Sequence, residues 1–193
     1  MRFDPIVLHS SLSFCYRIFA LIVGINNVSN HYRHTDSGSP TVQYNSNEIH
    51  CLSGAVGDAT RFKNHLHDTL GVPESNVKLL TDENATRAAI LDLFDYHLLN
   101  NLNIQKEKNP ILILYFAGHG GRVPAPKNWM TTDGNIETIC PVDDFTRDAD
   151  GNMIVGIPDI TLNIKLDQLA TNKGDNIVCC SLLSAYLLNF LHR

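Results

Sequence analysis

The stretch Pro110-Ile-Leu-Ile-Leu-Tyr-Phe-Ala-Gly-His-Gly-Gly121 decides the fold. Its apolar residues 111–116 follow a proline and end at alanine and glycine, which predicts a strand buried on both faces. Such strands are typical of parallel sheets that helices cover on both sides. His119 comes directly after this strand, and the carboxyl ends of parallel strands are where such sheets bind ligands.

Strand-like and helix-like segments alternate along the rest of the chain. Short apolar runs predict strands, and apolar residues at three-to-four spacing predict helices. The order β-α-β-α-β-loop-α-β predicts an α/β fold, with a mainly parallel sheet and helices packed on its faces. The expected strands are 19–24, 76–80, 111–116 and 175–180, the helices are 54–70, 86–98 and 161–170, and the long loops are 26–50 and 117–160.

The composition indicates one globular domain. The chain has 193 residues, 44% of them hydrophobic, which is enough for one buried core. Its 15 Lys and Arg against 20 Asp and Glu give a net charge of -5, which argues against a dedicated binder of nucleic acid or of membrane surfaces. No apolar run reaches the roughly 18 residues of a membrane span, and residues 1–9 lack the pattern of a signal peptide.

The cysteines point to a reducing compartment. There are 5, an odd number, and no C-x-x-C pair is present. This pattern is neither a disulfide framework nor a zinc site, so we expect free thiols and a cytoplasmic location.

Two groups suited to thiol chemistry fall at the carboxyl ends of expected strands. His119 follows the third strand, and Cys179 and Cys180 end the fourth. A thiol and an imidazole brought together make a nucleophile and its proton acceptor, and the Gly120 N–H is a candidate donor to an oxyanion. The structural alternative is that His119 hydrogen-bonds a loop and that the cysteines are inert buried thiols.

Acidic residues offer two further candidates. Asp58 falls in the first turn of an expected helix, where it is either a helix-start charge or an anionic pocket for a basic side chain. The acidic run 143–152 does not fit an EF-hand, because Ile157 stands where that loop needs a bidentate Glu. We therefore expect a solvated turn there, and no metal site elsewhere.

Several segments of the chain resemble caspase-like cysteine peptidases, above all the metacaspase-like (peptidase C14) proteins of fungi. The resemblance covers about residues 19–177 and is most specific at Tyr115-Phe-Ala-Gly-His-Gly-Gly121; the segments that carry it are Phe19–Ile25, Leu52–Ala59, Leu112–Gly121, Ile139–Asp144 and Gly156–Asp159. It implies a caspase-like three-layer sandwich that hydrolyses peptide bonds through a thioacyl enzyme. It also implies that His119 is the imidazole base and that Asp58 helps to bind an Arg or Lys of the substrate. Several members of the family need Ca²⁺.

The chain departs from the family pattern near its C-terminal end. The family has a full apolar strand followed by Asp-x-Cys-His-Ser-Gly, whereas Ile177 is followed at once by Val-Cys-Cys-Ser181. Cys180 is the best match to the nucleophile and Cys179 is its rival. About four strand residues are missing, or roughly 13 Å of reach at 3.3 Å per residue. We expect a fold that is truncated or aberrant at the C-terminus, with an N-terminal extension (1–18), a caspase-like large-subunit domain (19–180) and an apolar tail (181–193).

The resemblance implies a cysteine endopeptidase that acts on protein or peptide substrates through His119 and Cys180, with a preference for Arg or Lys. It also suggests a role in programmed cell death or in stress proteolysis. The alternative is an inactive homologue that pairs with itself or with a partner through an unfinished sheet edge. A flavodoxin-like small-molecule binder is a third hypothesis, although the chain has no phosphate loop of the G-x-x-x-x-G-K type.

Overall fold

A four-stranded parallel sheet forms the centre of the protein, in a computed structural model that describes residues 17–28 and 51–183. The strand order is β2-β1-β3-β7, and the order in the chain therefore differs from the order in the sheet. The strands are β1 (Ile18–Gly24), β2 (Val77–Thr81), β3 (Ile111–Gly118) and β7 (Ile177–Leu183). Every pair is parallel, as the alternation of strands and helices predicts.

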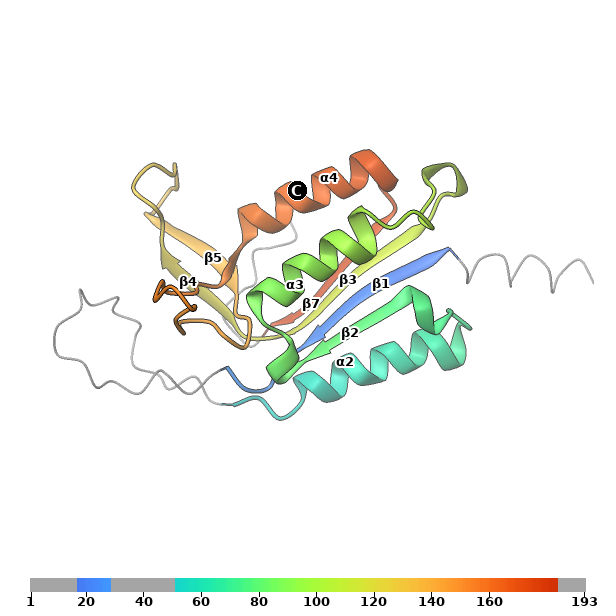
Figure 1. The fold of residues 1–193 in the computed structure, drawn as a ribbon, viewed down its shortest axis with the longest axis horizontal. Coiled ribbons are helices and arrows are strands. Elements are labelled where there is room, and N and C mark those ends of the chain that lie inside the picture. Colours follow the sequence, from blue (N-terminus) through green and yellow to red (C-terminus); the bar gives the residue numbers. More distant parts are fainter. Residues whose placement is uncertain (1–16, 29–50, 184–193) are drawn as a thin grey trace, which may run out of the picture.

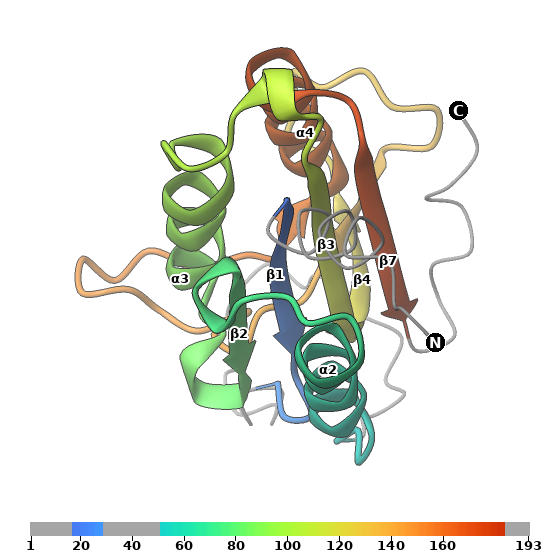
Figure 2. The same cartoon turned by 90° about the vertical axis from the view of Figure 1, so that its right-hand side faces the viewer.

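Helices cover both faces of this sheet and make three layers (Figures 1 and 2). One face carries α2 (Ala55–Asn64) and the π-helical turn η1 (His65–Thr69) that continues it. The other face carries α3 (Arg87–Leu93), its continuation η4 (Phe94–Leu99), and α4 (Asp159–Lys173). The three-layer prediction is confirmed.

Alternate residues of β1 feed two separate hydrophobic cores, because successive side chains of a strand point to opposite faces. Phe19, Leu21 and Val23 pack with residues of α3, η4 and α4. Ile18, Ala20 and Ile22 pack with residues of α2 and η1. All six side chains are buried, which explains why this strand is apolar throughout.

The first turn of α2 lies close against the end of β1. A Cβ on Gly24 would lie 2.6 Å from the Cβ of Ala59 and 2.9 Å from the carbonyl oxygen of Ala55, so only glycine permits this approach. The Val56 N–H also donates a 3.2 Å hydrogen bond to the Asn26 side chain, which follows β1. These contacts fix the start of α2, with Asp58, near the carboxyl edge of the sheet.

A second, antiparallel sheet lies in the segment that we expected to be a long loop. It has the order β4-β5-β6 and consists of β4 (Gly120–Pro124), β5 (Asn135–Ile139) and β6 (Ile157–Pro158). The prediction of a loop at 117–160 was therefore wrong in part. Short strands separated by Pro- and Gly-containing turns give too few alternating residues to be recognised as strands.

The remaining elements are single turns of 3-10 helix, namely η2 (Glu74–Asn76), η3 (Asp82–Asn84) and η5 (Lys106–Lys108).

The expected C-terminal tail begins inside the sheet. β7 continues through Leu183, so the first three residues of the expected tail 181–193 belong to the sheet. The rest of that tail, most of the expected extension 1–18 and residues 29–50 lie outside the described residues. None of the helices in the described ranges is long and apolar enough to span a membrane.

Candidate functional site

His119 is held at the carboxyl end of β3 by two neighbouring elements. It is half-buried and forms the one-residue link between β3 and β4. Its carbonyl oxygen accepts a 2.9 Å hydrogen bond from the backbone N–H of Cys140, directly after β5. Gly118, on its other side, packs so tightly that a Cβ there would lie 2.8 Å from the Phe116 ring. The backbone of His119 is therefore fixed at the edge where ligand sites of parallel sheets lie.

The Gly120 N–H points away from the second sheet. Because Cys140 N–H donates to the His119 carbonyl, these two residues form a hydrogen-bonded pair of the antiparallel ladder. Hydrogen-bonded and non-hydrogen-bonded pairs alternate, so the next pair, Gly120 with Ile139, is of the second kind. The Gly120 amide is thus directed away from β5, as a donor to an oxyanion would have to be.

Cys180 lies in the middle of β7, below the level of His119. In the ladder between β3 and β7, Cys180 is opposite Tyr115, and Leu183 is opposite Gly118. His119 is four residues beyond Tyr115, which corresponds to roughly 13 Å along the strand at 3.3 Å per residue. The structure therefore does not bring the Cys180 thiol within hydrogen-bond reach of the imidazole. This separation agrees with the shortfall of four residues expected from the sequence.

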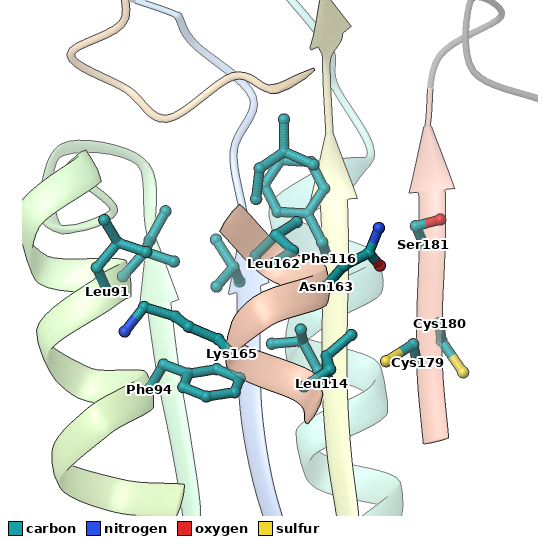
Figure 3. A pocket seen from close by; sticks show the side chains of 14 residues that line it. Leu91, Phe94, Leu114, Phe116, Leu162, Asn163, Lys165, Cys179, Cys180 and Ser181 are labelled. Atoms are coloured by element: carbon teal, nitrogen blue, oxygen red, sulfur yellow. The ribbon is translucent and has the colours of Figure 1, made fainter. Parts of the chain in front are cut away.

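Cys179 and Cys180 point to opposite faces of the sheet (Figure 3). Cys180 packs against the core on the α2 side, whereas Cys179 lines a pocket on the side of α3 and α4. Burial raises the pKa of Cys179, which lowers its thiolate fraction. Ala117 packs on the α2 side, so the alternation of β3 directs His119 toward that side as well. Of the two thiols, only Cys180 shares this face.

Asp58 lies on the same face as Cys180, with Tyr115 between them. The Phe62 ring of α2 stacks on Tyr115, with 4.6 Å between ring centroids and 18° between planes. Burial raises the pKa of Tyr115, and the nearby charges of Asp58 and Cys180 raise it further. The Asp58 carboxylate is engaged by the Arg61 guanidinium one turn later on α2. A basic substrate side chain would have to displace this exposed arginine to reach Asp58.

The structure reveals a buried polar cluster that the sequence reading did not assign. Thr138, Cys140 and Asp144 are each at most 2% exposed, and a Cβ on Gly121 would lie 3.1 Å from Thr138 Oγ1 and 3.2 Å from Cys140 Sγ. Burial, followed by the Asp144 charge, raises the pKa of the Cys140 thiol far above its usual range, so Cys140 is unsuited to be the nucleophile. Burial also raises the pKa of Asp144 to about 7. The segment Ile139–Asp144 carried part of the family resemblance, and that was the only signal for this cluster in the sequence.

Two carboxylates of the acidic run 143–152 accept hydrogen bonds from backbone N–H groups. Asp143 accepts a 2.7 Å hydrogen bond from the Arg87 N–H, and Asp148 accepts hydrogen bonds from the N–H groups of Asp150 and Asn152. Across residues 17–28 and 51–183, no three His, Cys, Asp or Glu side chains are grouped so as to hold a metal ion.

The four-stranded parallel sheet with helices on both faces agrees with a caspase-like α/β fold. The family model of the metacaspase, peptidase C14 domain matches residues 20–169. The chain therefore belongs to the metacaspase family of peptidase C14.

Curated relatives carry the same family name. Metacaspase-1A of Aspergillus oryzae is 32% identical over 98 residues, which cover 48% of this chain and 22% of that protein. Metacaspase-1B of Aspergillus fumigatus is also 32% identical over 98 residues, with the same shares of both chains. Metacaspase-6 of Arabidopsis thaliana is 29% identical over 101 residues, which cover 48% of this chain and 25% of that protein. The aligned part is thus a quarter or less of each relative's length.

Proposed function

We propose that this chain is the imidazole-bearing domain of a cysteine endopeptidase. The observation that carries the proposal is the position of His119, which follows β3 directly and whose carbonyl oxygen accepts a hydrogen bond from the Cys140 N–H. An imidazole at this edge takes the proton of a thiol during attack on a peptide carbonyl and returns it to the leaving amine. The Gly120 N–H stabilises the oxyanion that forms on the carbonyl oxygen. Protein or peptide substrates follow from this chemistry.

Cys180 is the nucleophile in this proposal, and the active arrangement requires a movement of β7. A displacement of β7 by four residues along β3 would bring Cys180 from Tyr115 to the level of His119. An even displacement keeps Cys180 on the α2 face, because side chains of a strand alternate with a period of two. The described register then represents a resting state in which thiol and imidazole are apart.

Asp58 supplies the preference for Arg or Lys at the cleavage site. Its carboxylate lies on the same face as Cys180, in the first turn of α2, where the helix dipole favours a negative charge. Its ion pair with Arg61 supports this role, because a guanidinium group already lies against the carboxylate. A substrate Arg would take the place of Arg61, whose side chain is 74% exposed and free to swing into solvent.

Peptide cleavage by matched variants tests the proposal. The purified chain is incubated with peptides that contain Arg, Lys or Asp, with and without Ca²⁺. His119→Ala and Cys180→Ala should each reduce cleavage at least about 1,000-fold, because either change removes a partner of the proton transfer. Cys179→Ala, which removes the neighbouring thiol from the opposite face, should leave cleavage unchanged. Cleavage that survives either of the first two substitutions would exclude that residue from the mechanism.

A second candidate function is that of an inactive interaction module, and the exposed surface of β7 favours it. β7 pairs only with β3 among the described strands, so its other backbone edge has no strand partner there. Val178 and Leu182 are 41% and 54% exposed and alternate with Cys180 on one face. An exposed apolar edge strand accepts an additional strand from a second copy or a partner.

Sedimentation velocity distinguishes this second function. Self-association should increase with protein concentration and should be weakened by Leu182→Lys. The control is Leu102→Lys, at a loop residue that is 89% exposed and far from β7 in the chain. Equal association of both variants would contradict pairing through β7. A cytoplasmic location remains a prediction from the cysteine content, and a role in programmed cell death or stress proteolysis remains a prediction from the resemblance.

A further inference from the structure

A cavity of about 190 Å³ lies between the sheet and the helices α3 and α4, on the face opposite α2 (Figure 3). Apolar side chains from several elements form its walls. They include Leu91 of α3, Phe94 of η4, Leu114 of β3, Leu162 and Leu166 of α4, and Cys179 of β7. The cavity therefore lies on the α3–α4 side of the sheet and not at the His119 end of β3, and it opens to solvent beside Asn163 and Ser181.

The burial of β3 side chains shows that this part of the core is open. Leu112 and Phe116 are 0% and 4% exposed, yet Leu114, which lies between them on the same face, is only half-buried. Leu114 belongs to an inner strand, flanked by β1 and β7. Protein interiors are normally packed without voids of this size. The gap above Leu114 is thus a space that a further group of atoms can fill.

The charge at the wall of the cavity is already compensated. Among the described residues that line it, Lys165 is the one with a charged side chain. Its Nζ lies 2.6 Å from Asp95 Oδ1 and 5.5 Å from the centre of the Phe94 ring. An anionic occupant would have to compete with Asp95, and a cationic occupant would meet apolar carbon. These walls therefore favour a neutral occupant.

We propose that this cavity is a binding site for a small, neutral, apolar molecule of the size of a single aromatic ring. An apolar cavity of roughly 150 Å³ is large enough to bind benzene, so the volume here suits a ligand of that size. Binding would bury the ligand against leucine and phenylalanine carbons and would restore close packing above Leu114. The site belongs to the described register of β7, in which Cys179 lines the cavity, and its test needs no peptidase activity.

Benzene is the probe that tests the site, by two measurements on the purified chain. At about ten times its Kd, benzene should raise the Tm by about 3–6 °C. Cys179→Phe, which fills the cavity from β7, should abolish this rise. Cys180→Phe is the matched control and should keep the rise, because Cys180 also borders the cavity but its side chain points to the other face.

The reaction of the two thiols with N-ethylmaleimide gives the second measurement and needs no substitution. Benzene at the same concentration should slow the modification of Cys179 roughly tenfold, because about one molecule in ten then has an empty cavity. Modification of Cys180 should not change. The absence of both effects in the unsubstituted chain, or an equal Tm rise in Cys179→Phe, would overturn the proposal. If Cys179→Phe does not fold, protection of Cys179 decides alone. None of these results depends on peptidase activity.

Discussion

The backbone N–H of Cys140 donates a 2.9 Å hydrogen bond to the carbonyl oxygen of His119, so the residue after β5 holds the residue after β3. The Cys140 side chain points into the polar cluster with Thr138 and Asp144. The position of His119 thus depends on the small antiparallel sheet, whose middle strand leads into this buried cluster.

The stability of the protein should depend on the protonation of Asp144. The pKa of this carboxyl is raised to about 7 in the folded protein from 3.8, because burial disfavours its charged form. The folded state therefore holds the proton when the unfolded state has lost it. The stabilisation from this group is fully present below pH 4 and is lost as the pH rises through about 7, by up to about 4 kcal/mol.

Urea unfolding from pH 4.5 to 8 measures this effect. The free energy of unfolding of the unsubstituted chain should fall with pH relative to that of Asp144→Asn, which lacks the titrating group. Asp150→Asn, at an exposed residue of the same loop, should retain the dependence. Parallel pH profiles for the unsubstituted chain and Asp144→Asn would rule out a raised pKa at this site.

The cysteines should differ strongly in their reaction with iodoacetamide. Cys51 is exposed, whereas Cys140 is 2% exposed and has a pKa raised by burial. Alkylation requires an accessible thiolate, so Cys51 should react more than about 100-fold faster than Cys140 in the folded chain. Peptide mass spectrometry after timed quenching gives both rates. In urea, where both thiols are exposed, the two rates should become comparable. Comparable rates in the native protein would be incompatible with the described packing of β5.

Substitution of Gly24 should be costly because of the contact between β1 and α2. A Cβ at this position would lie 2.6 Å from the Cβ of Ala59. Gly24→Ala should therefore lower the free energy of unfolding by about 1–3 kcal/mol, as overpacking does in other cores. Gly54→Ala is the control, since its nearest neighbour would be 3.8 Å away, and we expect a change within about 1 kcal/mol. If Gly24→Ala and Gly54→Ala lower the free energy of unfolding equally, α2 lies farther from β1 than described.

The ionisation of Tyr115 should report on Asp58. Burial raises the pKa of Tyr115, and the negative charge of Asp58 raises it further. Asp58→Asn removes that charge and should lower the pKa of Tyr115, measured by NMR of a chain labelled with ¹³C-tyrosine. Asp68→Asn, beyond α2 in η1, should leave it unchanged. If the pKa of Tyr115 does not change in Asp58→Asn, Asp58 does not lie near Tyr115 on the face that carries Cys180.

The apolar periodicity in the sequence was enough to predict the parallel sheet and the helices that cover it. Each of these elements buries a long apolar face, so the spacing of its apolar residues in the sequence follows the period of a helix or a strand. The strands β4, β5 and β6 were missed because they have five residues or fewer and lie among prolines and glycines. Their pairing is a property of the folded chain and not of any local pattern.

The candidate site was predictable only in part. His119 was placed correctly at a strand end because a glycine-rich segment follows an apolar run. Cys180 pairs with Tyr115 because of the register in which β7 joins β3 after α4. Residue types alone do not specify this register. The cluster around Asp144 was not foreseen, since its members are separated in the chain and become neighbours only through the pairing of β5.

The place of β7 at the margin of the sheet has a consequence for synthesis on the ribosome. β2, β1 and β3 are neighbours in the sheet, and all three leave the exit tunnel before β7 does. Domains begin to fold from their N-terminal part during translation. The nascent chain can thus form the sheet of β2, β1 and β3 first. β7, which carries both adjacent cysteines, then pairs with the exposed edge of β3.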